Sequence, residues 1–435
     1  MNKFLFKHID NSPLILFRII FGFLIAVEGF GAILTGWVKR TLMAPQETFT
    51  FIGFEWLQPL PGNGMLFYYG IMGLMGVLVM VGYKYRFAMF TFTIMWTATY
   101  LMQKSSYNNH YYLLILISAF MAIMPAHRYF SVDAKQNPKI KSNSMPQWCV
   151  VVFIIQMFIV YTYAAVAKIY PDWLDTTVVE LLMKRREHFW LVGDLIQEKW
   201  VHYAIAYFGI LFDAFIVPLL LFKPTRILGF IAGIFFHLFN SFIFHIGIFP
   251  YLAIGLTVFF FQPKTIKSIF FKRKEFYDKG EVIVPKYKNL GIAIFSVYFV
   301  VQVLLPLRHW AIKGDVLWTE EGHRLSWRMM LRSRAGITSY KVVDKSTGET
   351  IAVKLEDYLT DKQIGPARSK PDFMWQFAQR LKRIYAEEGR DVSVYVSSNV
   401  SINGGKTSKL IDSSVDLANV PWDIFWHSDW ILLRN

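Results

Sequence analysis

One lysine is prominent among the residues that could carry chemistry. Lys168 follows twenty-one residues without a charge, and Trp173 stands five residues after it. A lysine amine becomes a usable general base when burial stabilises its neutral form. The alternative is a lysine at the end of an apolar helix, whose long side chain reaches water and anchors that end.

A short polar turn separates two apolar runs. Residues 107–112 read Tyr-Asn-Asn-His-Tyr-Tyr, which places Asn109 beside His110. An asparagine amide can donate to a developing oxyanion, and a histidine can shuttle a proton near neutral pH. The alternative is an ordinary interfacial cap of tyrosine and histidine on a helix hairpin.

A polar stripe lies inside a later apolar run. His237, Asn240 and Ser241 stand at positions i, i+3 and i+4, and His245 follows close to the same helix face. Such a stripe should face the bundle interior or a cavity, or else form a hydrogen bond between two helices. Because there is no HxH or HExxH pattern and Cys149 is the only cysteine, we expect no metal site.

A fourth group of residues follows the last apolar run. Trp327, Met329 and Met330 lie among arginines in residues 325–332 and could wall an apolar ligand site. The alternative is packing of an outer domain onto the bilayer surface. No phosphate-binding loop, dinucleotide fingerprint or GxSxG motif is present.

Membrane-spanning helices must position these residues. The chain has 435 residues, is 54% hydrophobic and contains 40 Phe and 14 Trp, which suits a lipid-facing exterior with aromatic belts. We predict a polytopic α-helical membrane protein of about nine spans. The predicted spans are residues 13–37, 64–82, 87–103, 110–126, 147–167, 201–221, 226–244, 246–262 and 289–307.

The distribution of charge predicts an orientation. The net charge is +15, but the cations lie mostly in short loops, so we expect no nucleic-acid partner. With the N-terminus in the cytoplasm, inner loops carry 18 Lys and Arg and outer loops carry 8. The positive-inside rule then predicts a multi-pass protein of the inner (cytoplasmic) membrane, with its C-terminal domain on the periplasmic or outer side. The N-terminus reads as a cytoplasmic stub and not as a cleaved signal.

The composition changes after the last predicted span. Two β-rich runs in 338–355 predict a hairpin, 371–388 has the spacing of an amphipathic helix, and 391–402 alternates as a strand. We therefore expect a transmembrane domain at 1–307 and an extramembrane α+β domain, rich in β structure, at 308–435.

Fragments of one known pattern recur in order over roughly residues 12–435. They are Asn108-Asn109-His110, residues 127–133, Ala167–Trp173, residues 236–241 with 246–249, and Trp318-Thr319 with residues 326–330. In these fragments the chain resembles the vitamin K-dependent γ-glutamyl carboxylases and their bacterial relatives, the horizontally transferred transmembrane (HTTM) domain proteins.

The resemblance implies a membrane enzyme in which Lys168 is the base that deprotonates reduced vitamin K, such as menaquinol. In the family the quinol reacts with O2, and the oxygen base so formed takes a γ-proton from a peptide glutamate. CO2 then adds, and the quinone leaves as its 2,3-epoxide. The resemblance implies that Asn109 and His110 position the reactants and stabilise negative charge. It further implies quinol or peptide contacts, on the outer face, for His237, Asn240, Trp173, His323, Trp327, Met329 and Met330.

The sequence departs from the animal enzymes at two places. Ala167 stands where they have a second lysine, and Gly322-His323 stands where they have a Leu-Tyr pair that contributes to glutamate handling. His323 could itself bind a carboxylate. Two alternatives therefore stay open: an enzyme that forms the epoxide or uses a quinol without carboxylation, and a quinone-binding, lipid-binding or transport protein. A transporter should show paired broken spans, and we find none.

Overall fold

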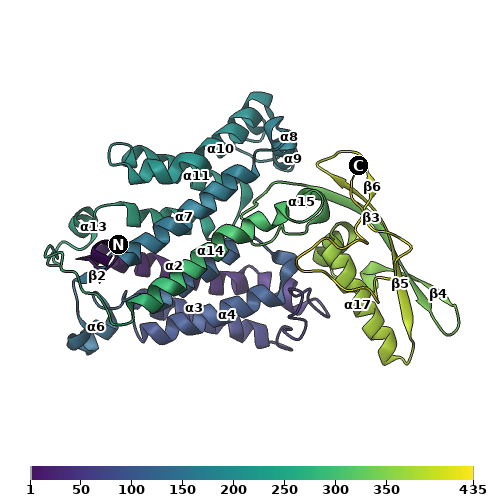
Figure 1. The fold of residues 1–435 in the computed structure, drawn as a ribbon, viewed down its shortest axis with the longest axis horizontal. Coiled ribbons are helices and arrows are strands. Elements are labelled where there is room, and N and C mark those ends of the chain that lie inside the picture. The colour runs from purple at the N-terminus through teal and green to yellow at the C-terminus, as the bar shows by residue number, and fades with distance from the viewer. Residues whose placement is uncertain (1, 435) are drawn as a thin grey trace.

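The computed structural model describes residues 2–434 and is mostly helical, with a β-sheet domain at one end (Figure 1). Within these residues, six helices are long and apolar enough to cross a membrane. They are α2 (Ser12–Leu34), α3 (Gly64–Val81), α7 (Trp148–Ala167), α10 (Lys199–Leu221), α11 (Arg226–Phe244) and α14 (Lys288–Leu307). The predicted class, a polytopic helical membrane protein with a separate C-terminal domain, is confirmed.

Helices also form at the other three predicted spans, but each falls short of a full crossing by length or hydropathy. They are α4 (Tyr85–Met102), α5 (Asn109–Ile123) and α12 (Phe249–Leu256), which η5 (Thr257–Phe260) extends. Helix α4 contains four threonines and an arginine, and the other two helices are short. The count of nine spans therefore stays a prediction. Shorter helices are α1 (Asn2–Leu5), α6 (Val132–Gln136), α8 (Pro171–Leu174), α9 (Thr177–Lys184), α13 (Pro263–Phe270) and α15 (Val316–Thr319).

Small residues bring α2 and α3 into close contact. A Cβ atom added at Gly76 would lie 2.4 Å from the backbone nitrogen of Ala26, and one at Gly29 would lie 2.6 Å from that of Gly73. Without a hydrophobic driving force inside a bilayer, helix pairs depend on such close backbone approach. Helix α4 packs on α3, whereas α7, α10 and α11 pack on one another in sequence from α7 to α10 to α11.

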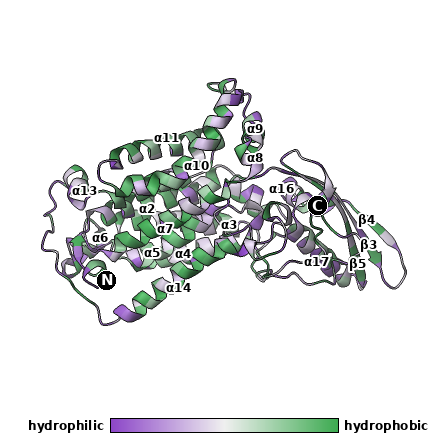
Figure 2. Ribbon diagram, turned by 45° about the horizontal axis from the view of Figure 1, so that its top comes forward, coloured by the Kyte–Doolittle hydropathy of each residue, from purple (hydrophilic) through white to green (hydrophobic). Residues whose placement is uncertain are grey.

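Helix α14 carries its apolar side chains on the outside of the bundle. Only 11% of its span is buried inside the protein, and Val297 is 65% exposed. Figure 2 shows hydrophobic residues along α14 and the other long helices, while the domain on the right is mixed in hydropathy. An exposed apolar helix of this length fits contact with lipid.

The bundle has two ends. At the end that holds the N-terminus, β1 (His8–Asp10) pairs with β2 (Ser144–Pro146), and Asp10 forms a fully buried ion pair with Lys274 (Figure 1). The C-terminal domain covers the other end, which we call the sheet end.

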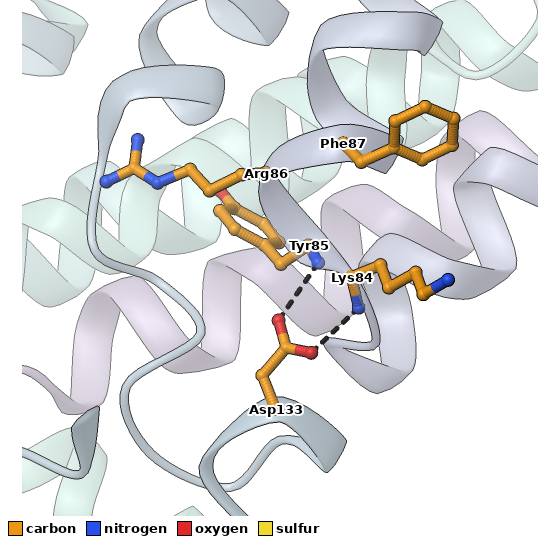
Figure 3. A pocket seen from close by; sticks show the side chains of 5 residues that line it. All are labelled: Lys84, Tyr85, Arg86, Phe87 and Asp133. Carbon is orange, nitrogen blue, oxygen red and sulfur yellow. Dashed lines mark hydrogen bonds between the residues drawn. The ribbon is translucent and has the colours of Figure 1, made fainter. Parts of the chain in front are cut away.

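A hollow of about 440 Å³ lies where α4 begins (Figure 3), beside α6 at the end away from the sheet (Figure 1). Its lining includes Lys84, Tyr85 and Asp133. The Asp133 carboxylate accepts hydrogen bonds from the backbone nitrogens of Lys84 (2.8 Å) and Tyr85 (3.0 Å). It thus caps the first turn of α4 from a distant segment, which is a structural role.

The C-terminal domain is built on a four-stranded antiparallel sheet of order β4-β3-β5-β6. Strands β3 (Arg334–Asp344) and β4 (Thr350–Val353) form the predicted hairpin, and β5 (Val392–Ile402) is the predicted strand. Helix α17 (Pro371–Glu387) is the predicted amphipathic helix, and its apolar face packs on β5. The remaining elements are β6 (Ser408–Lys409) and α16 (Asp361–Ser369), which packs along β3.

Candidate functional site

The site begins with a buried ion pair at the sheet end of α7. Lys168 caps α7, and its Nζ lies 2.5 Å from Oδ2 of Asp213 on α10. The same amine donates to the carbonyl oxygen of Ala164 at 3.2 Å. The Lys168 side chain is 10% exposed and that of Asp213 is 5% exposed. The lysine therefore turns inward to a carboxylate and does not extend outward to water.

Trp173 and Gly209 lie beside the Lys168 side chain. The Trp173 ring centroid lies 5.6 Å from the Lys168 amine, and its indole nitrogen donates to the Ala206 carbonyl on α10 at 3.2 Å. Gly209 leaves room for the pair, since a Cβ there would meet Lys168 Cε at 4.0 Å. The structure thus brings together Trp173 and Lys168, both predicted site residues.

Asp213 was missed by the sequence reasoning. It is the one acidic residue in the predicted span 201–221, and that isolation was an available signal. An ionisable residue inside an apolar span is a functional candidate whose partner should be sought.

Two predicted histidines meet at one aromatic ring. His110, in the first turn of α5, stacks on Phe249 with ring centroids 3.8 Å apart. The His237 ring meets the same Phe249 edge to face at 5.8 Å, and its Nε2 lies 2.8 Å from the Tyr161 hydroxyl. His237 is buried, and its Nδ1 has no hydrogen-bond partner among residues 2–434. Asn240 is not part of this group, because its amide donates to Phe236 on its own helix.

The predicted Asn109 joins the helices to the segment after the last span. Its amide donates to the Arg328 carbonyl at 2.9 Å, and its Oδ1 accepts from the Tyr107 hydroxyl at 2.8 Å. The Tyr107 oxygen in turn accepts from the Leu325 backbone nitrogen at 2.7 Å. Asn109 thus positions this segment, whereas its predicted charge-stabilising role stays a prediction.

Trp327 inserts into the helical bundle, whereas the neighbouring methionines lie nearer its surface. The Trp327 ring is 1% exposed and stacks on Tyr112 of α5 with centroids 5.0 Å apart. Gln302 on α14 donates to the Tyr112 hydroxyl at 2.7 Å. Met329 is partly buried against the bundle core, and Met330 is 37% exposed.

A buried group of charged side chains joins the two domains, and we call it the seam cluster. Asp372 Oδ2 lies 2.6 Å from Lys104 Nζ and 2.9 Å from Arg324 Nη1. Glu320 pairs with Arg332 at 2.5 Å. The complete cluster is Lys104, Glu320, His323, Arg324, Arg332, Arg334, Lys370 and Asp372.

The seam cluster holds more positive than negative charge. Burial lowers the pKa of both Lys104 and Lys370 to about 8. Burial opposes ionisation of Asp372, but Arg324 and Lys104 outweigh it and hold the pKa of Asp372 at about 2. Burial and the Arg332 charge hold the pKa of His323 well below its ordinary value, so the ring is neutral. Five cationic side chains thus face two carboxylates, an arrangement that favours an anion.

Several buried donors in this region have no partner among residues 2–434. They include Nη2 of Arg334, Nε of Arg324 and the indole nitrogen of Trp327. His323, one of the predicted site residues, lies 2.9 Å from Arg332 through its Nε2. Sequence reasoning found His323 and Trp327 but missed Lys104 and Asp372, which pair with each other. Nothing in the sequence next to either residue indicated that pairing.

Within residues 2–434, no group of three or more His, Cys, Asp or Glu side chains is placed to hold a metal ion. A second hollow, of about 220 Å³, lies between residues 47–55 and α17 and is lined by Trp375, Gln376 and Arg380. It lies on the same side of the bundle as the seam cluster.

Comparisons with known proteins assign the chain to a family. No solved structure matches the chain. Residues 287–435 match the lumenal domain of vitamin K-dependent gamma-carboxylases. Residues 6–264, more than half of the chain, match the HTTM domain, so the chain belongs to the HTTM family and carries the lumenal domain of the vitamin K-dependent gamma-carboxylases.

Proposed function

We propose that the chain is a membrane-bound γ-glutamyl carboxylase that couples oxidation of a reduced vitamin K, such as menaquinol, to carboxylation of peptide glutamate. O2 and CO2 are the co-substrates. The observation that carries this proposal is Lys168, a buried amine paired with Asp213 at the sheet end of the bundle. A buried amine can accept or pass on the proton of a phenol-like hydroxyl.

The residues around Lys168 suit a quinol ring. Trp173, Phe249 and Phe212 offer aromatic surface, and Phe212 meets the His237 ring edge to face at 5.7 Å. His237 has a buried nitrogen without a partner in the part of the chain that the structure describes, and this nitrogen is free to bond a quinol oxygen. When bound, the reduced quinone supplies the electrons that reduce O2 and so generate a strong base. We propose that His237, Trp173 and His110 hold this co-substrate.

The seam cluster supports carboxylation over an enzyme that forms the epoxide alone. Its excess of buried positive charge favours a ligand with a carboxylate, such as a glutamate side chain. Asn109 and Trp327 connect the segment that carries Arg324 and Arg332 to α5, the helix of His110 and Tyr112. A peptide held there would lie at the same end of the bundle as Lys168.

The proposed location follows from the loop charges. With 18 basic residues in the loops of one side and 8 in those of the other, we propose that the N-terminus is cytoplasmic. The domain from about residue 308 then lies outside the inner membrane. There it would meet a glutamate-containing peptide or protein, with membrane lipid around residues 1–307.

The test uses the purified protein in lipid nanodiscs with reduced menaquinone, O2 and labelled bicarbonate. We expect epoxide and labelled peptide when a glutamate peptide is present. Lys370→Met should raise KM for the peptide several-fold, because it removes a buried cation from the seam cluster. Lys345→Met is the control, since this lysine lies on the exposed hairpin.

Epoxide formed at one rate with or without peptide, and without label in the peptide, would favour the enzyme that forms the epoxide alone. Neither product under any condition would leave a quinone-binding, lipid-binding or transport role.

A further inference from the structure

Asp213 has fewer hydrogen-bond donors than Asp10, the carboxylate of the buried ion pair at the opposite end of the bundle. Among residues 2–434 it accepts one side-chain hydrogen bond, from Lys168 at 2.5 Å. Asp10, in the ion pair at the opposite end, also accepts from the Ser12 backbone nitrogen (2.9 Å) and the Tyr277 backbone nitrogen (3.0 Å). Extra donors stabilise the ionised form of a carboxylate, and Asp213 lacks them.

The surroundings of the pair favour transfer of a proton from the Lys168 ammonium to the Asp213 carboxylate. Beyond the ion pair itself, the Lys168 amine donates to the Ala164 carbonyl oxygen, and the carboxylate accepts from no second side chain among residues 2–434. The desolvation cost of the carboxylate is therefore only partly offset, which favours its protonated form. Trp173 supplies an aromatic wall there, with its ring centroid 5.6 Å from the amine. The Tyr161 hydroxyl, also on α7, is hydrogen-bonded to His237 and not to the pair.

We infer that Lys168 relays a proton and that Asp213, which positions Lys168, is its final acceptor. This inference rests on the proposed function for the source of the proton. In the first transfer an N–H bond of the Lys168 ammonium breaks and an O–H bond forms at Asp213 Oδ2. In the second, the freed lone pair of Nζ takes the proton of the substrate hydroxyl. The pair gains one positive charge, the substrate loses one proton, and Lys168 ends as an ammonium beside it.

This assignment differs from a lysine that acts alone as a neutral base. A lone neutral lysine needs no carboxylate, so Asp213→Asn would leave its activity intact. The relay needs Asp213 both to take the proton and to hold the amine toward the substrate. In Asp213→Asn the amine is neutral but no longer held, so quinol oxidation should slow by ~10²-fold or more. Asp213→Glu, which restores a carboxylate, should recover much of the rate.

A second readout needs neither quinol nor turnover. The protein without quinol is treated with a small amine-acylating reagent, and labelling of Lys168 is followed by peptide mass spectrometry. Only the neutral amine reacts. We expect slow labelling in the wild type, at least tenfold faster labelling in Asp213→Asn, and slow labelling again in Asp213→Glu. Exposed Lys345 in each sample is the internal reference.

Each result decides between the two assignments. Equal labelling of Lys168 in wild type and Asp213→Asn, including none in either, would overturn the inference, as would near-normal turnover by Asp213→Asn. If the wild type oxidises no quinol, the proposed function fails, while the labelling comparison still tests the ion pair.

Discussion

Neutralising Asp372 should loosen the C-terminal domain from the helical bundle. Its carboxylate lies in the first turn of α17 and bonds Lys104, in the turn between α4 and α5, so it joins the two domains directly. Asparagine has nearly the same shape, so Asp372→Asn removes the charge and little else. The seam cluster has three more cationic side chains than carboxylates, and after this substitution it would have four more.

The magnitude follows from the pKa of Asp372. Its value of about 2 lies roughly two units below the ordinary aspartate value of ~3.9, which corresponds to ~2.6 kcal/mol. Loss of one partner from a buried ion pair costs ~3–5 kcal/mol. The Asp372 side chain is 2% exposed, so solvent screens little of this. We expect Asp372→Asn to destabilise the folded state by about 3 kcal/mol.

The assay is thermal unfolding in detergent, followed by tryptophan fluorescence and by proteolysis of the C-terminal domain. Asp391→Asn is the matched control, because Asp391 pairs with Lys345 at the surface, with side chains 69% and 39% exposed. Such pairs contribute at most ~1 kcal/mol. Equal shifts for the two variants would refute the reasoning.

The pH dependence provides a second check on Asp372. Its folded-state pKa is depressed, so its stabilisation is complete above the unfolded value near ~4 and is lost as pH falls toward about 2. The difference between wild type and Asp372→Asn should therefore shrink over that interval. A constant difference would assign the effect to packing and not to charge.

Two further predictions concern helix packing and peptide binding. Gly76→Val should destabilise the bundle by ~1–3 kcal/mol because its side chain meets the backbone of α2. Gly70→Val on the same helix is the control, because a side chain there meets nothing within 4 Å. Melting temperatures in detergent compare the two variants. Raising the pH through about 8 removes protons from Lys104 and Lys370, whose pKa values burial has lowered. KM for a glutamate peptide should therefore rise several-fold from pH 7 to 9 in steady-state assays, and a flat profile would separate these lysines from peptide binding.

Hydropathy and periodicity were sufficient to predict most elements. The helix at 371–388 and the strand at 391–402 were found because one face of each must be buried. Six of the nine predicted spans are observed as full crossings, since α5 and the α12 segment are apolar but short, and α4 is long enough but not apolar enough. The charge of each loop predicts orientation but says nothing about packing between domains.

The site was predicted only in part because its contacts join distant segments. Lys168 was found from its isolation at the end of an apolar run, a local signal. Its partner Asp213 lies 45 residues away, and the pairing depends on how α7 and α10 cross. Asn240 illustrates the reverse case, because helical spacing placed it beside His237, yet its amide bonds its own helix.

The central claim is that Lys168 moves the proton that starts a quinol-dependent carboxylation. The most direct test compares wild type, Lys168→Ala and Lys168→Arg in nanodiscs with reduced menaquinone, O2, labelled bicarbonate and a glutamate peptide. We predict that wild type forms epoxide and labelled peptide. Both variants should lose both products by ~10²-fold or more, since alanine has no amine and guanidinium does not release its proton. Near-normal product formation by either variant would contradict the claim.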